Sequence, residues 1–169
     1  MQSGDRPPSN HFLPILGIHA PPEFTIGNMT NYFITRITSD GKSANDFKTD
    51  DINSSAFSLF KDGHIQNIQA YITPNKIYYQ ADCLPEMKNI TYTIRLTLNS
   101  NNGDIQYARC GCAAGNGPTG SCKHIPAMCY ALEDFLVFTN FVIMSCTFQC
   151  RHGTNHGSVI CKWDQAGIW

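Results

Sequence analysis

Three cysteines and one histidine lie within fifteen residues of this 169-residue chain. Cys110 and Cys112 form a Cys-x-Cys pair, and Cys122 and His124 form a Cys-x-His pair after a loop of nine residues. Thiolate and imidazole are the usual donors of a structural zinc ion, which takes four such ligands in a closed tetrahedron. The pattern therefore predicts one structural Zn²⁺ held by Cys110, Cys112, Cys122 and His124.

The spacing also suggests how the ligands are held. Side chains two residues apart in an extended backbone point to the same side, so each pair can bind one ion from a single segment. Gly115, Gly117, Pro118 and Gly120 lie between the pairs and favour a tight turn, because glycine accepts positive φ and proline presets its own. Disulfide-bonded or free buried thiols remain the alternative to a metal site.

The residues before the first pair have the alternating apolar and polar pattern of β-strands. The expected strands are residues 64–72, 77–83, 91–98 and 105–110. They predict an antiparallel meander of about four strands, whose last strand ends at Cys110. From Lys123 onward, apolar residues recur with the period of a helix, so the expected fold class is α+β.

Composition and periodicity divide the rest of the chain. Dense proline predicts an N-terminal arm without regular structure, and two apolar faces of helical period predict short helices over residues 25–37 and 52–61. The expected organisation is an arm at 1–23, a helical region at 24–63, the meander with its zinc-binding loop and helix at 64–138, and a C-terminal tail at 139–169.

The remaining cysteines divide into two groups. Cys83 ends a strand pattern and Cys129 faces away from His124 on the helical period, so both are expected to be buried thiols outside the metal site. The tail contains a second group of possible ligands whose spacing matches no common zinc finger. Its members are Cys146, Cys150, His152, His156 and Cys161. A second metal site and a tail without metal both remain open.

The bulk composition narrows the function. Charged residues make up 15 % of the chain and the formal net charge is −1. The chain therefore lacks the excess of positive charge that is typical of proteins that bind nucleic acid through bulk charge. The N-terminus does not resemble a signal peptide, and no apolar run is long enough for a membrane span. We therefore expect an intracellular, reducing location and no membrane partner.

No catalytic motif is found. The chain has no nucleophile elbow, P-loop, HExxH or paired-carboxylate pattern that would predict a catalytic residue. A hydrolase that uses an open zinc ion is a further alternative, but four protein ligands leave no position for a reactive water. We expect a binding protein and not an enzyme.

Residues 105–136 resemble the SWIM-type zinc finger. More widely, residues 57–138, with the segments FSLFKDGHIQNIQ and YTIRLTLNSNNGDIQYARCGCAAG, resemble the SWIM-bearing N-terminal half of animal proteins related to YqaJ-type viral recombinases. In those proteins a nuclease domain follows, and we expect this chain to lack it. The resemblance implies zinc ligation by the same four residues, an origin in a mobile element or virus, and an accessory that binds but does not catalyse.

Two basic residues flank the ligands. Arg109 and Lys123 are candidates for contacts with nucleic-acid phosphates, although two charges are a modest electrostatic attraction. The expected function is a zinc-binding module that assists binding to DNA or to a DNA-bound protein, with a nuclear location favoured over a cytoplasmic one. The alternative is a protein–protein interaction module with a purely structural zinc, and the oligomeric state stays open.

Overall fold

A computed structural model describes residues 7–15, 24–35, 49–84, 90–116 and 122–135. The elements are a 3₁₀ turn η1 (Ser9–His11), β1 (Leu13–Pro14), α1 (Ile26–Thr35), α2 (Thr49–Lys61), β2 (Ile65–Ile72), β3 (Lys76–Cys83), β4 (Tyr92–Asn99), β5 (Ile105–Cys110) and α3 (Ala113–Asn116). Residues 124–135 form a further helix, which is called the final helix below.

The strands form one antiparallel sheet in the order β1-β2-β3-β4-β5. This arrangement confirms the α+β class and the meander, to which β1 adds a fifth strand. The prediction that the proline-rich arm lacks regular structure is wrong at β1, where Leu13 pairs with Ala70 and Pro14 with Gln69. Proline is tolerated there because β1 is an edge strand, where a missing N–H interrupts no further ladder.

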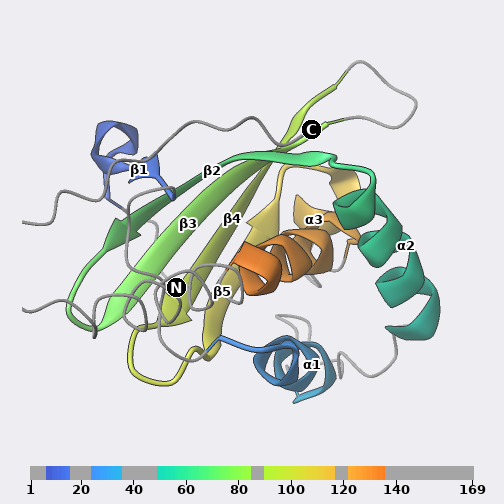
Figure 1. Cartoon of the computed structure of the whole chain (residues 1–169), viewed down its shortest axis with the longest axis horizontal. Helices are drawn as coiled ribbons and strands as arrows, with labels where there is room; N and C mark the ends of the chain where they lie inside the picture. Colours follow the sequence, from blue (N-terminus) through green and yellow to red (C-terminus); the bar gives the residue numbers. More distant parts are fainter. Residues whose placement is uncertain (1–6, 16–23, 36–48, 85–89, 117–121, 136–169) are drawn as a thin grey trace, which may run out of the picture.

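The final helix lies against one face of the sheet, which we call the inner face, and α2 packs on that helix (Figure 1). The final helix crosses this face and contributes Ile125, Met128 and Leu132, each at most 1 % exposed. These side chains belong to the same core as the inner-face residues Ile77, Tyr79, Ala81, Ile94, Leu96 and Leu98. Burial of each large aliphatic side chain contributes about 1.5–3 kcal/mol, so this layer supplies much of the stability of the fold.

Local signals define the ends of the two N-terminal helices. Asn28 accepts hydrogen bonds from the backbone N–H and the hydroxyl of Thr25, which caps the start of α1. The backbone N–H of Ile26 donates to Glu133 on the final helix over 2.9 Å, so α1 is tied to the inner layer. Helix α2 ends at Lys61, and Gly63 follows two residues later with a φ of 71°, the left-handed conformation that glycine adopts freely.

The two isolated cysteines are in the core. Cys83 and Cys129 are free thiols with no exposed surface, as predicted. Residues 139–169, with the possible second ligand group, lie outside the described residues. Among the helices that the structure describes, none combines the length and apolar character needed to cross a bilayer.

Candidate metal centre

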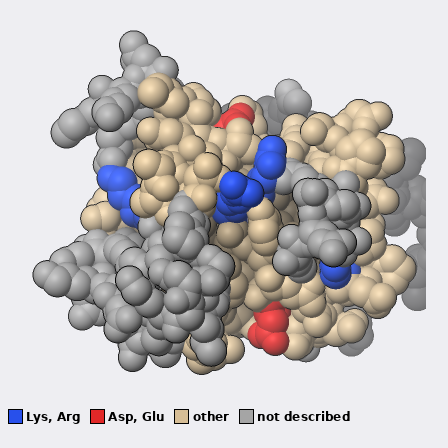
Figure 2. Space-filling model, turned by 180° about the vertical axis from the view of Figure 1, so that it is seen from behind, with Lys and Arg blue, Asp and Glu red and all other residues tan. Residues whose placement is uncertain are grey.

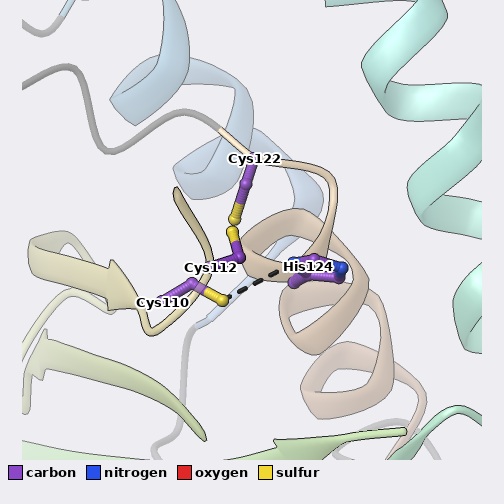
Figure 3. Close-up of side chains that lie close together, drawn as sticks. All are labelled: Cys110, Cys112, Cys122 and His124. Carbon is purple, nitrogen blue, oxygen red and sulfur yellow. Dashed lines mark hydrogen bonds between the residues drawn. The ribbon is translucent and has the colours of Figure 1, made fainter. Parts of the chain in front are cut away.

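The structure brings the four predicted ligands together (Figure 3). One donor atom from each of Cys110, Cys112, Cys122 and His124 lies within 4.8 Å of every other. The Sγ of Cys110 is 3.5 Å from Nδ1 of His124. All three cysteines are free thiols, so the disulfide alternative does not describe this cluster.

The donor set and its size fit one metal ion. With zinc–sulfur bonds of about 2.3 Å and zinc–nitrogen bonds of about 2.0 Å, neighbouring ligand atoms of a tetrahedron stand about 3.5–3.8 Å apart. The separation between Sγ of Cys110 and Nδ1 of His124 is already 3.5 Å, and no pair of donor atoms is more than 4.8 Å apart. The three cysteines are buried and His124 is half-buried, so the site is protected from water.

The first ligand pair is at the end of β5. Cys110 pairs with Ile94 of β4 and points to the inner face, toward the final helix. The chain then bends instead of staying extended, and the carbonyl of Cys112 accepts the N–H of Asn116 over 2.9 Å in the single turn of α3. The expectation that extended backbone orients both thiols is therefore wrong, because a helical turn orients Cys112.

The second ligand pair is at the start of the final helix. Cys122 precedes a turn at Lys123, and His124 is the first helical residue. The ring of Tyr92 lies against the imidazole of His124 with 5.2 Å between centroids, which restricts the orientation of the ligand. The pair thus enters the cluster from the layer opposite β5.

Gly115 has a different role from the one its sequence suggested. The described glycines with positive φ are Gly63 and Gly103, so Gly115 does not need left-handed backbone. A Cβ built on Gly115 would stand 2.4 Å from Cβ of Cys110 and 2.8 Å from Sγ of Cys122. Glycine is required here because α3 packs directly on the ligands. Gly117, Pro118 and Gly120 lie outside the described residues.

Hydrogen bonds within the cluster favour one thiolate. The hydrogen bond from Cys122 lowers the pKa of Cys110 to about 4, against the effect of burial and with help from His124. The same hydrogen bond, followed by burial, raises the pKa of Cys122. Burial raises the pKa of Cys112, while the N–H of Gly115 donates to its sulfur over 3.2 Å and acts in the opposite direction. A metal ion that binds all three sulfurs must displace the remaining protons.

The two basic candidates differ in position. Arg109 is exposed and belongs to the opposite, outer face of the sheet, since side chains alternate along β5 and Cys110 is on the inner face. Its guanidinium donates through Nε to Oδ1 of Asn116 over 2.7 Å, and Nη2 contacts the same oxygen. Lys123 is half-buried and lies between the ligands Cys122 and His124.

Sequence reasoning did not identify Tyr92 or Asn116 as part of the site. Tyr92 belongs to β4 and Asn116 to α3, and nothing in their local sequence indicates contact with His124 or Arg109. Comparison with protein-family models, curated proteins and solved structures gives no match. The functional conclusions therefore depend on the geometry of this site.

Proposed function

We propose that this chain is a zinc-binding module of the SWIM type that assists nucleic-acid binding. The observation that carries the proposal is the cluster of three thiols and one imidazole whose donor atoms lie within 4.8 Å of one another. Soft thiolate ligands with imidazole favour zinc over magnesium or calcium, which prefer oxygen. One ion per chain is the expected stoichiometry.

The proposed ion has a structural role. Four protein ligands complete a tetrahedron and leave no open position for a reacting water. Two of the ligands come from the end of β5 and the bend before α3, and the other two come from the start of the final helix, in the layer that covers the sheet. Binding of zinc would join the sheet to its covering helix and contribute directly to folding.

Binding of DNA is supported by the basic residues beside the ligands. Arg109 is adjacent to Cys110, and Lys123 is adjacent to both Cys122 and His124. An ion bound to these cysteines and His124 would fix the positions of the backbone at Arg109 and Lys123. The two positive charges would then be held at a constant spacing, which would favour contacts with phosphates. The resemblance to the SWIM-bearing half of YqaJ-related proteins supports the same function, an origin in a mobile element, and a nuclear location.

A protein–protein module with a purely structural zinc is the second candidate. The net charge of −1 gives no general attraction to polyanions. Several large apolar side chains are also exposed on the described surface: Leu13 by 61 %, Phe57 by 45 %, Ile72 by 44 % and Ile90 by 52 %. Such residues can belong to a protein interface, although single exposed apolar residues are common.

Two measurements test the proposal. Metal analysis of the purified chain should give one zinc per chain. Fluorescence anisotropy with labelled DNA should show weak binding that declines between about 50 and 200 mM salt. The double variant Arg109→Ala/Lys123→Ala should lose this binding, whereas Lys61→Ala on α2 should retain it. A zinc-loaded chain that binds no nucleic acid at low salt would favour the protein–protein function.

A further inference from the structure

Two arginines stand opposite each other on the outer face of the sheet. Arg95 of β4 and Arg109 of β5 are Cα partners in the antiparallel ladder, and both are exposed. Side chains directly opposite each other on one face have Cβ atoms about 4.5–5.5 Å apart, and like charges in such a pair destabilise a sheet. An anion bound between the two side chains would relieve this repulsion.

Neither arginine forms an ion pair within the described part of the protein. Among the described residues, the Arg95 side chain makes no hydrogen bond, and the Arg109 guanidinium donates to the neutral amide of Asn116. Asp82, which belongs to the same face, accepts a hydrogen bond from Asn67 over 3.0 Å. Figure 2 shows this side of the molecule, with basic atoms near the centre and also at the left and lower right, and acidic atoms above and below the centre.

Tyrosines form the adjacent row of the outer face. Tyr78 and Tyr107 are the two Cα partners of Thr97, two residues along β4 from Arg95. Tyr78 also lies beside Tyr71 of β2, with ring centroids 6.3 Å apart. All three rings are half-buried, so part of each remains accessible. Since a strand rises about 3.4 Å per residue, the rows of tyrosines and arginines are about 7 Å apart.

We propose that this outer face binds single-stranded nucleic acid, with Arg95 and Arg109 on the phosphates and Tyr78 and Tyr107 against the bases. The inference rests on the proposed nucleic-acid function and specifies its surface and its substrate class. Alternating charge and aromatic rings match the backbone and bases of an unpaired strand, whereas the bases of a duplex are stacked and inaccessible to rings on a sheet. An acidic peptide would use the arginines but leave the tyrosines without a role.

The first test uses the zinc-loaded chain and a labelled twelve-residue oligothymidylate. Arg95→Ala should weaken binding about fivefold at low salt and reduce the slope of log K against log salt by about 0.7, which corresponds to one lost phosphate contact on a single strand. Arg95 is the most informative position, because its removal breaks no described hydrogen bond. Lys61→Ala, which removes one charge from α2, should bind as the parent does.

The second test separates aromatic contact from charge. Tyr107→Leu should weaken binding about fivefold or more, since stacking on one base contributes about 1–3 kcal/mol. Tyr107→Phe retains the ring and should bind within twofold of the parent. Zinc content and the thermal transition are measured for every variant. If Tyr107→Leu loses zinc, the affinity of Arg95→Ala alone decides whether the outer face binds the single strand.

Three results would overturn the inference and leave the proposed function intact. They are unchanged affinity in Arg95→Ala, tighter binding to a twelve-base-pair duplex than to the single strand, and loss of binding in Tyr107→Leu and Tyr107→Phe alike with zinc retained. Equal affinity for a polyglutamate peptide would assign the face to acidic proteins. No binding to any nucleic acid by the zinc-loaded chain would overturn the proposed function itself.

Discussion

Gly115 packs so closely on Cys110 that a Cβ at position 115 would stand 2.4 Å from Cβ and 3.2 Å from Cα of the cysteine. Neither atom is the end of a flexible side chain, so neither can move without moving β5. The third near atom, Sγ of Cys122 at 2.8 Å, belongs to a ligand. The turn of α3 is therefore part of the candidate metal centre, and the absence of a side chain at position 115 is a requirement of its packing.

Gly115→Ala should lower zinc affinity at least tenfold and destabilise the fold by about 1–3 kcal/mol, the usual cost of overpacking. Gly111→Ala is the matched control, since a Cβ there would meet only backbone atoms of Thr93 at 3.8 and 3.9 Å. Competition with a coloured zinc chelator measures the affinity. Similar losses in both variants would contradict the close packing at Gly115.

Chelation should unfold the part of the chain that the proposed zinc joins. The free energy of zinc binding to small structural sites is about 10–16 kcal/mol, which matches or exceeds the total stability of a typical domain of about 5–15 kcal/mol. Circular dichroism should show loss of the sheet and the final helix with excess chelator, and recovery when zinc is returned. An unchanged thermal transition in the zinc-free chain would remove the structural role of the metal.

Cys122→Ala should reproduce the effect of chelation, because three ligands hold a structural zinc poorly and leave the start of the final helix unanchored. Cys129→Ala makes the same chemical change in the core at a thiol outside the cluster. It should keep one zinc per chain and lose only a small part of the unfolding free energy. Metal analysis after gel filtration compares the two, and equal zinc content would contradict the ligand assignment.

Stability should decline in alkali. Burial raises the pKa of Tyr79 above its ordinary 10.0 and that of Cys129 above its ordinary 9.0, so both stay protonated in the folded chain after the unfolded chain has lost these protons. Their contribution is complete below pH 9 and is lost as pH rises through 9 and 10, by about 1.4 kcal/mol per group for each further unit.

Urea unfolding of the zinc-loaded chain at pH 7.5, 9.0 and 10.5 measures this decline. Tyr79→Phe removes one of the two buried acids and keeps the ring in the core, so its unfolding free energy should fall less steeply above pH 10 than that of the parent. The same slope in both proteins would show that Tyr79 does not remain neutral in the folded state.

The sequence by itself predicted the four residues that come together in the cluster, and most of the strands. The members of each pair are only two residues apart in the sequence. The Cys-x-Cys and Cys-x-His spacings can therefore be recognised without knowing the backbone conformation that orients the side chains. Alternation along β4 and β5 reports which side chains face the core, and the burial of Ile94, Leu96 and Cys110 follows it. The burial of Cys83 was predictable from its place at the end of a strand pattern, and that of Cys129 from the period of the final helix.

Only the tertiary structure decided which distant residues meet. Three contacts join segments that are distant in the sequence, and local patterns do not predict them. They are the pairing of β1 with β2, the contact of Tyr92 with His124, and the cross-strand pair of Arg95 and Arg109. Strand register and helix docking are selected by the packing of the whole core, because shifting a register by one residue would exchange the two faces of a strand. The role of Gly115 was also decided by the tertiary structure. The sequence shows only that a glycine is present, whereas the fold shows that Cys110 and Cys122 occupy the space that a side chain would need.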